Sequence, residues 1–266
     1  MAISKNEVEG GEQLLGAVRT IAKAAGDVLL EHFGRRDTKA HIKDVGHYVS
    51  EADVAAENVI VEKISAAYPA HSIMTEEGRN ASGSSSLQWI VDPLDGTHNF
   101  LHGIPHFAVS IAVYDKDMPV CGVVLNPSTN DVYSAIRGQG AFLNRDRLQV
   151  SPAAELSEVL LATGFHYDRT TTSATLAMLD RWLHSGVHGV RRMGVAALDL
   201  CYVASGQFGG FVEHKLSPWD FAAGRLIVEE AGGKVTDLQG NVPGTGTTGI
   251  VASNRAIHDQ LLASMQ

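Results

Sequence analysis

Cysteine is scarce in this chain, with only two among 266 residues. Cys121 and Cys201 lie far apart in apolar stretches, and no CxxC spacing occurs. We interpret them as two buried free thiols in a reducing compartment. The N-terminus lacks a basic and then apolar signal pattern, and no apolar run reaches the length of a membrane span. These absences predict a cytoplasmic protein without a membrane partner.

Positive charge is also in short supply. The 21 Lys and Arg residues stand against 30 Asp and Glu residues, so the formal net charge is −9. A chain with this balance is not expected to carry a broad footprint for nucleic acid or for an anionic membrane. If the ligand is itself an anion, a cation must neutralise the acidic site that receives it.

Several common catalytic motifs are missing as well. The twelve histidines form no HExxH pattern, and no GK[ST] follows the Gly/Ser-rich stretch 78–86. The spacing of Asp92 and Asp95 fits neither the DxD of enzymes with an aspartyl nucleophile nor an EF-hand, which places carboxylates at alternate positions. His102 and His106 need not share a helix face, and we interpret both as structural or surface residues.

Length and hydrophobic patterning predict a layered fold. With 44% hydrophobic residues, the chain can bury a sizeable core, and residues 1–266 are expected to form one domain, or two halves over 1–150 and 151–266. Groups of helices and short strands favour an α+β sandwich, with an antiparallel meander over 107–144. Helices are predicted over 8–32, 51–66, 173–185, 195–205, 218–231 and 255–264, and strands over 71–75, 87–91, 107–115, 119–127, 131–137, 140–144, 157–164, 207–213, 234–238 and 248–254.

The segment WIVDPLDGTHNF, residues 89–100, places two aspartates at the end of an apolar strand. Pro93 cannot donate a backbone hydrogen bond and favours an extended conformation at Asp92, so a regular ladder should end there. Gly96 permits a sharp turn, and a helical turn from Thr97 would point free N–H groups toward the carboxylates. Carboxylates, a carbonyl and a hydroxyl favour a hard cation such as Mg²⁺, and amides beside a cation favour phosphate. A simple Asx-type turn is the alternative reading of D-P-x-D alone.

Three further acidic positions each have an ordinary structural explanation. Asp53 lies in a capping box opened by Ser50. Asp220 lies in the first turn of a helix that begins with a proline, and Glu76 follows a predicted strand and precedes a second glutamate. Each of these residues could have a purely structural role in its own helix or strand. It is the combination of these residues with the two aspartates of the 89–100 segment that points to chemistry.

These motifs form a recognisable set: DPLDGT at 92–97, TEEG at 75–78, SEAD at 50–53, and WDFAAG at 219–224 followed by EEAGG. Together they resemble the inositol monophosphatase family of Mg²⁺-dependent, lithium-sensitive phosphatases. The resemblance runs nearly end to end, and RRMGVAALDLCYVASG at 191–206 is similar to bacterial members. It implies a layered αβαβα sandwich of the sugar-phosphatase type, usually as a homodimer.

The resemblance also implies roles for individual residues. Asp53 and Thr97 would orient and deprotonate the attacking water, and Glu76 would bridge metal ions. The amides of Gly96 and Thr97 would hold the phosphate, and Glu213 would contact a sugar-ring hydroxyl. The ligands of Mg²⁺ would be Glu76, Asp92, the carbonyl of Leu94, Asp95 and Asp220. The substrate would contact Asp95, Gly96, Thr97, Gly194, Val195, Ala196, Glu213 and Asp220.

The implied activity is hydrolysis of a small phosphate ester, first of all inositol 1-phosphate, by metal-activated water. Val195 stands where the family often has a small hydroxyl residue, so histidinol phosphate, a sugar bisphosphate and a nucleotide 3′-phosphate stay open as substrates. His166 stands near the mouth of the site where bacterial relatives often have proline, and Lys43 lies near the family's early loop. Arg191-Arg192 could touch substrate or a dimer partner, or form a solvated pair. A regulatory binding protein with secondary catalysis is the alternative of another class.

Overall fold

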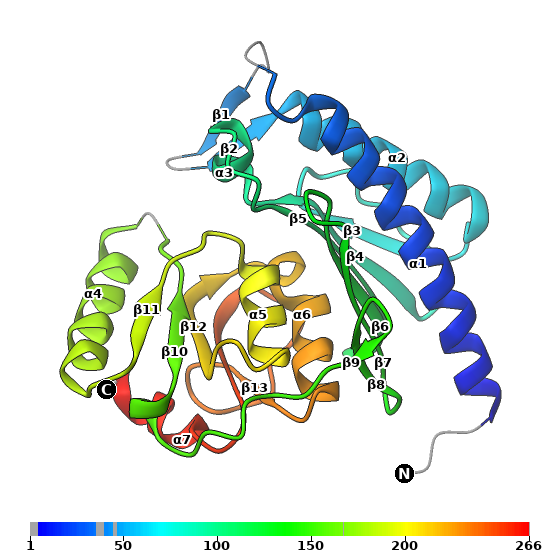
Figure 1. Ribbon diagram of the computed structural model, residues 1–266. Helices are drawn as coiled ribbons and strands as arrows, with labels where there is room; N and C mark the ends of the chain where they lie inside the picture. The colour runs from blue at the N-terminus through cyan, green and yellow to red at the C-terminus, as the bar shows by residue number, and fades with distance from the viewer. Residues whose placement is uncertain (1–4, 36–39, 45–46, 167, 266) are drawn as a thin grey trace.

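The computed structural model describes residues 5–35, 40–44, 47–166 and 168–265. Figure 1 shows five layers in which helices and sheets alternate: helices, a seven-stranded sheet, helices, a five-stranded sheet and helices. This arrangement confirms the predicted α+β architecture and the layered αβαβα sandwich. Among the described residues, no helix combines the length and the apolar character needed to cross a membrane.

The first sheet contains seven strands that follow one another in chain order. The first two strands are parallel, and all the other pairs are antiparallel. The predicted meander over 107–144 is therefore confirmed. The strands are β3 (Ser72–Thr75), β4 (Leu87–Asp95), β5 (Ala108–Asp115), β6 (Met118–Asn126), β7 (Asp131–Ile136), β8 (Gly140–Leu143) and β9 (Asp146–Arg147).

The second sheet contains five strands in a mixed order. Its two parallel pairs require crossover connections, and helices supply them. Across the sheet the strands are β11 (Gly189–Arg191), β10 (Leu160–Thr163), β12 (Gly210–Leu216), β14 (Thr248–Ser253) and β13 (Lys234–Thr236).

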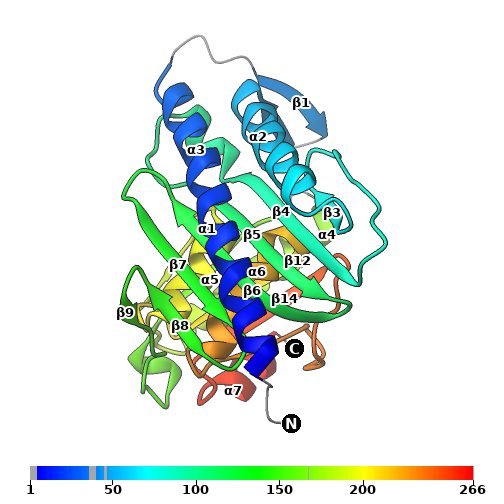
Figure 2. The same cartoon turned by 90° about the vertical axis from the view of Figure 1, so that its right-hand side faces the viewer.

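Helices cover both faces of both sheets, which explains why strand β5 is buried along almost its whole length rather than at alternate residues. One pair of helices crosses the outer face of the seven-stranded sheet (Figure 2), a second pair fills the space between the sheets, and a third pair covers the outer face of the five-stranded sheet. In that order the pairs are α1 (Lys5–His32) and α2 (Glu51–Ala67), α5 (Ala196–Ala204) and α6 (Pro218–Glu230), and α4 (Arg169–His184) and α7 (His258–Ser264).

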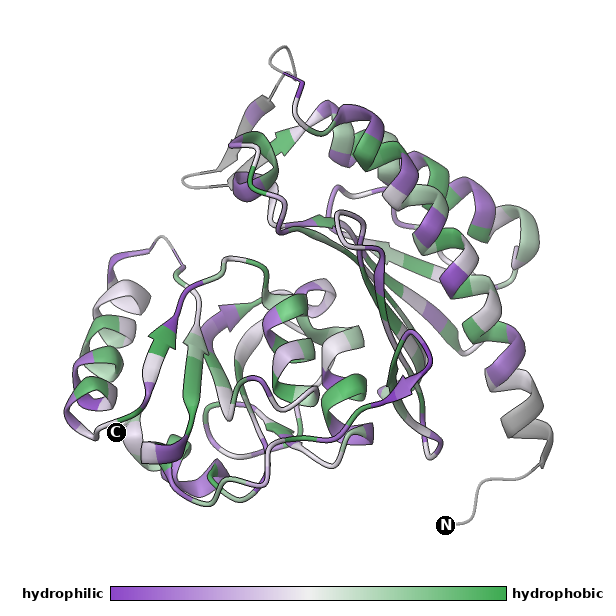
Figure 3. Cartoon of the chain, in the orientation of Figure 1, coloured by the Kyte–Doolittle hydropathy of each residue, from purple (hydrophilic) through white to green (hydrophobic). Residues whose placement is uncertain are grey.

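The buried apolar residues form three clusters, one at each helix layer. Apolar residues gather along the strands and on the helix surfaces that face them (Figure 3). The central cluster joins both sheets through α5 and α6, and the hydroxyl of Tyr114 on β5 donates to the carbonyl of Ala222 on α6 at 3.1 Å. This shared core favours one domain over two separable halves, although the division of the chain into domains stays a prediction.

The structure also contains elements that the sequence analysis did not predict. The hairpin of β1 (Ala40–Asp44) and β2 (His47–Ser50), the two-residue strand β9 and the short strand β11 were all missed. Each is a short edge element without a strong hydrophobic pattern. The predicted C-terminal helix begins later than expected, at His258, whereas the helical turn at Thr97 exists as α3 (Thr97–Leu101).

Candidate active site

The end of strand β4 is distorted where the two aspartates lie. Asp92 pairs with Ser110 and Asp95 pairs with Ala108, so β4 has one more residue than β5 over this stretch. Such a bulge bends the strand and redirects its side chains. The prediction that Pro93 would interrupt the regular ladder is therefore confirmed. Gly96 follows with a φ of 96°, a left-handed conformation that favours glycine, and α3 begins at the next residue.

Glu76 lies beside Asp92 because β3 and β4 run in parallel. Thr75, the last residue of β3, pairs with Val91, and the amide of Glu76 donates to the carbonyl of Val91 at 3.2 Å. The next residue of each strand is therefore an acid, and both acids lie at the same end of the sheet. The strand pairing thus brings together two residues that sequence analysis had placed in separate motifs.

Asp220 reaches the same end of the sheet from the other side. The hydroxyl of Ser110, which pairs with Asp92, donates to the carbonyl of Trp219 at 3.3 Å. Asp220 is the next residue, in the first turn of α6, where its carboxylate also accepts from the amide of Ser217 at 2.7 Å. The predicted helix start with a proline at its first position is confirmed at Pro218, and the acid of this first turn also lies beside the β4 carboxylates.

Burial, together with the proximity of the four acids, raises the pKa values of the three aspartates. Burial raises the pKa of Asp92 well above its ordinary value, and the charges of Glu76, Asp95 and Asp220 raise it further. Burial raises the pKa of Asp95 to about 8, and burial followed by the charge of Asp95 raises the pKa of Asp220 to about 8. Like charges in one desolvated space disfavour each other's ionised forms. A cation between them would reverse this penalty.

The oxygen donors fit a hard cation, but they do not yet surround one. Among the described residues, no group of three or more His, Cys, Asp or Glu side chains is arranged so as to hold a metal ion as it stands. The donors are carboxylate oxygens and the carbonyl of Leu94, which is the set that Mg²⁺ prefers. Binding of an ion would therefore require these oxygens to rearrange around it.

Asp53 has two partners, one for each carboxylate oxygen. Its Oδ2 accepts from the amide of Ser50 at 2.9 Å and from the Ser50 hydroxyl, which confirms the predicted capping box of α2. Its Oδ1 accepts from the hydroxyl of Thr97 at 3.0 Å. Burial raises the pKa of Asp53 to about 6, although the hydrogen bonds from Ser50 and Thr97 oppose the rise. The side chain of Asp53 is therefore both a helix cap and a candidate catalytic group.

The predicted substrate wall lies opposite the β4 bulge. A Cβ atom on Gly96 would be 2.7 Å from Cγ2 of Val195, so the absence of a side chain at Gly96 permits this close approach. Val195 is fully buried, so its side chain contacts Gly96 rather than open solvent. Gly194 before it has a φ of 79°, and Ala196 begins α5. The valine therefore shapes the wall through packing and not through a polar group.

Glu213 lies on β12 next to the end of β10. A Cβ atom on Gly164 would be only 2.0 Å from its Oε2, so glycine leaves the space that this carboxylate occupies. Burial, and then the charge of Asp220, raise the pKa of Glu213 to about 8. Glu213 therefore lies within electrostatic range of the acidic cluster, as a residue that contacts the alcohol part of the substrate would.

The sequence and the fold can be compared with those of known proteins. The sequence pattern of the inositol monophosphatase family matches residues 11–266. The chain belongs to this family.

A relative from Salmonella typhimurium, named Nus factor SuhB, is 44% identical over 252 residues, which are 94% of each chain. The crystal structure of the extragenic suppressor protein suhB from Bartonella henselae superposes with a TM-score of 0.90 at 39% identity, over 96% of this chain and 98% of that chain. The inositol monophosphatase from Anabaena superposes with a TM-score of 0.83 at 38% identity, over 96% and 95% of the two chains. The fold of this inositol monophosphatase family member is thus shared by its relatives from end to end.

Other predicted positions lie around the acidic cluster or away from it. Nδ1 of His166 lies 2.7 Å from Oδ2 of Asp168, the N-cap of α4. Lys43 belongs to β1, but its side chain lies outside the described residues. The ring of His106 stacks on Tyr202 at 6.0 Å between centroids, which supports a structural role.

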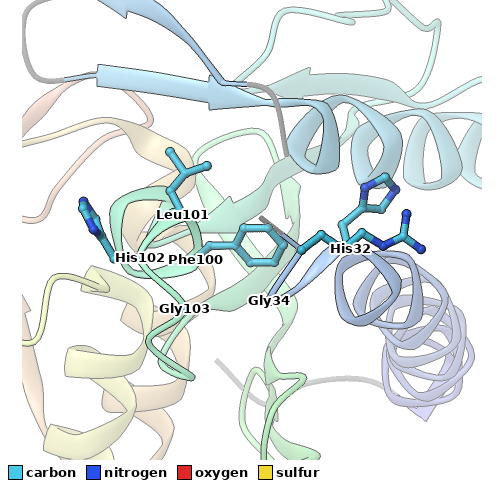
Figure 4. A pocket seen from close by; sticks show the side chains of 7 residues that line it. His32, Gly34, Phe100, Leu101, His102 and Gly103 are labelled. Carbon is cyan, nitrogen blue, oxygen red and sulfur yellow. The ribbon is translucent and has the colours of Figure 1, made fainter. Parts of the chain in front are cut away.

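A cavity of about 240 Å³ lies behind α3, at the end of α1. Its lining includes His32, Phe100 and His102, and none of the predicted site residues. In Figure 4 the side chain of His102 points away from the Phe100 ring, so the basic groups do not converge on one point. This cavity is therefore separate from the candidate active site.

Sequence analysis missed three residues close to the site. Gly164 makes room for Glu213, but a glycine at a strand end carries no signal for that role. Asp199, on α5, is buried, and its Oδ1 lacks a hydrogen-bond partner; burial raises its pKa well above the ordinary value, as do the charges of Glu213 and Asp95. Asn99 lies inside the predicted 89–100 segment, yet its contacts depend on chain segments that only the fold brings together.

Proposed function

We propose that this protein is a Mg²⁺-dependent phosphatase that hydrolyses a small phosphate monoester, most readily inositol 1-phosphate. The single observation that carries the proposal is the convergence of Glu76, Asp92, Asp95 and Asp220 from three separate elements at one end of the seven-stranded sheet. Membership of the inositol monophosphatase family supports the same conclusion.

Glu76, Asp92, Asp95, Asp220 and the Leu94 carbonyl would hold the divalent cations. When bound, such ions supply Lewis-acid chemistry that activates water and stabilises a leaving alkoxide. The acidic residues would bind the cations, and the positive charge that the cations bring would favour binding of a phosphate dianion despite the net negative charge of the chain.

Asp53 and Thr97 would orient the water that attacks phosphorus. Thr97 donates its proton to Asp53, so the lone pairs of the threonine hydroxyl are directed away from that carboxylate and can accept a hydrogen bond from water. Asp53 would then receive the proton that the water loses, through the threonine hydroxyl. A carboxylate whose pKa is raised to about 6 is a better proton acceptor near neutral pH than an ordinary aspartate.

The amides of Gly96 and Thr97 would bind the phosphate oxygens, since α3 begins at this point. Gly194, Val195 and Ala196 would form the wall beside the alcohol, and Glu213 would accept a hydrogen bond from one of its hydroxyls. Because the buried Val195 offers no polar group, we infer that discrimination among alcohols is modest.

A substrate panel tests this proposal. Phosphate release is measured with Mg²⁺ from inositol 1-phosphate, histidinol phosphate, a sugar bisphosphate and a nucleotide 3′-phosphate. The proposal expects the highest kcat/KM for inositol 1-phosphate. Much faster turnover of histidinol phosphate would show that the substrate assignment is wrong while the phosphatase reaction is right. Absence of phosphate release from every ester would contradict the enzymatic function.

A binding role is the second candidate, because a relative at 44% identity carries the name Nus factor. In this alternative the fold acts as a regulatory partner and catalysis is secondary. An Asp92→Asn chain expressed in a strain that lacks the native gene separates the two roles. Full restoration of growth by the inactive variant would favour the binding role. A homodimer is also expected from the family resemblance, and light scattering of the purified protein tests it.

A further inference from the structure

Asn99 joins three parts of the chain that lie far apart in sequence. Its Nδ2 donates to the carbonyl of His106 and to the carbonyl of Met193, both at 2.9 Å. A primary amide has two N–H donors on one nitrogen, so both are used here. The side chain thereby fastens α3 to the loop before β5 and to the turn before α5.

Asp95 makes a second connection to the same turn. Its Oδ2 accepts from the amide of Ala197 at 2.7 Å, in the first turn of α5. Val195, the N-cap residue, supplies no side-chain hydrogen bond to this helix, so the cap comes from β4 instead. Residues 193–197 are therefore held at both ends by the segment that runs from Asp95 to Asn99.

The wall lies between these two attachment points. Val195 packs directly against Gly96, which has no side chain in the way, and Gly194 allows the turn with its positive φ. Asp95 is expected to bind a metal ion, so its carboxylate cannot be varied without altering the chemistry. The side-chain hydrogen bonds of Asn99 go to the carbonyls of His106 and Met193 and not to the acidic cluster, so Asn99 can be varied without removing a proposed metal ligand.

We propose that Asn99 is a positioning residue that sets the distance between the Asp92–Thr97 loop and the Gly194–Ala196 wall, and so sets how tightly the site binds the alcohol part of the substrate. The inference rests on the proposed phosphatase function and deepens it. Loss of the Met193 attachment releases one end of the wall, while the Asp95 attachment and the acidic cluster stay in place. Binding of the alcohol part of the substrate weakens, and the reacting groups keep their geometry.

The test compares Asn99→Asp with the matched variant Asn254→Asp. Asn254 also donates from Nδ2 to two backbone carbonyls, those of Ser151 and Ala153 at 2.9 and 2.7 Å, but these residues belong neither to the acidic cluster nor to the wall. Both substitutions keep the size of the side chain and remove both donors. If the lost hydrogen bonds are the main effect, the two substitutions should lower the free energy of unfolding by similar amounts. Melting temperatures of the two purified full-length variants establish that match.

Kinetics with inositol 1-phosphate and with p-nitrophenyl phosphate then separate positioning from stability. For Asn99→Asp, the KM for inositol 1-phosphate should rise about tenfold while kcat changes less than about threefold, the pattern of lost ground-state binding. The KM for p-nitrophenyl phosphate, whose leaving group has no ring hydroxyls, should change little. Asn254→Asp should leave the ratio of the two KM values as in the wild type.

Several outcomes overturn the inference. Equal changes for both substrates, or the same change in Asn254→Asp, would mean that Asn99 only stabilises the fold. If Asn99→Asp does not fold, Asn99→Ser is measured in the same way, and failure of both where Asn254→Asp folds has the same meaning. If the wild-type protein is active and the Asn99 variants keep its ratio of the two KM values, only the inference about Asn99 is contradicted. A wild-type protein that is inactive on every ester contradicts the proposed function as well.

Discussion

The hydroxyl of Thr97 donates to Oδ1 of Asp53 at 3.0 Å, although the two residues lie 44 positions apart in the chain. The same hydroxyl lies 3.2 Å from the carbonyl of Leu94. Asp53 is meanwhile fixed by the capping box of α2, so its carboxylate cannot rotate away. The starts of α2 and α3 thus hold the proposed proton-transfer pair in place, and the first prediction concerns that pair.

Thr97→Val removes the hydroxyl and keeps the shape of the side chain. We expect kcat to fall about 100-fold or more, because the attacking water loses both its orientation and its path for the proton. Thr97→Ser keeps the hydroxyl and should retain most of the activity. Steady-state phosphate release at saturating Mg²⁺ measures both. Near-normal kcat in Thr97→Val would remove Thr97 from the mechanism.

Gly164→Ala tests the placement of Glu213. The added methyl group would lie 2.0 Å from Oε2 of Glu213, so the carboxylate must move. We expect the KM for inositol 1-phosphate to rise about tenfold, because a hydrogen bond to a ring hydroxyl is lost. Glu213→Gln, which keeps the shape and weakens the acceptor, should show a smaller rise. An unchanged KM in both variants would show that Glu213 does not contact the alcohol.

His258 makes folding stability depend on pH. The ring is buried, Nε2 lies 2.9 Å from the hydroxyl of Thr236, and Nδ1 lies 2.8 Å from the hydroxyl of Ser253. Burial, with a further contribution from Lys234, lowers its pKa to about 4, whereas an unfolded histidine titrates near pH 6.5. The folded state therefore binds fewer protons than the unfolded state between these values. This part of the stability is complete above about pH 6.5 and is lost as the pH falls toward 4.

The size of the effect follows from the same two pKa values. We expect the free energy of unfolding of the wild type, relative to His258→Gln, to decrease by up to about 3 kcal/mol between pH 7 and pH 4. Urea unfolding at a series of pH values measures both proteins, and the difference removes the contributions of the other titrating groups. If the difference in unfolding free energy between the two proteins does not change with pH, the pKa of His258 is not lowered by folding.

The resemblance to the family predicts that lithium inhibits the protein. Li⁺ should inhibit phosphate release at a fixed Mg²⁺ concentration, and K⁺ at equal ionic strength is the control. Indifference to lithium throughout the millimolar range would contradict the expectation and would indicate that the cation positions differ from those of the family.

Much of the site could be predicted from the sequence because its residues lie in short, dense motifs. Pro93 and Gly96 indicate a broken strand and a turn, and the structure has a bulge and a left-handed glycine there. Asp53 was harder, since the capping box alone explains it, and only the fold shows that its second oxygen meets Thr97. The local sequence gives no signal that the capping residue Asp53 also contacts a second candidate site residue.

Contacts between distant segments account for what could not be predicted. Asp95 caps α5, which begins about a hundred residues later, and no pattern near either residue indicates that pairing. Asn99 lies in the same motif as the aspartates, yet its partners are carbonyl groups, which look alike at every position in a sequence. The β1–β2 hairpin was missed because its strands are short and rich in His and charged residues.

The most direct test of the account is a crystal soaked with Mn²⁺ and phosphate and measured for anomalous scattering. Mn²⁺ takes the same oxygen ligands as Mg²⁺ and gives a signal that locates it. The account predicts at least one peak at about 2.0–2.3 Å from carboxylate oxygens of Glu76, Asp92 and Asp220, and no such peak in Asp92→Asn under the same conditions. Wild-type crystals with no anomalous peak near these carboxylates at saturating Mn²⁺ would contradict it.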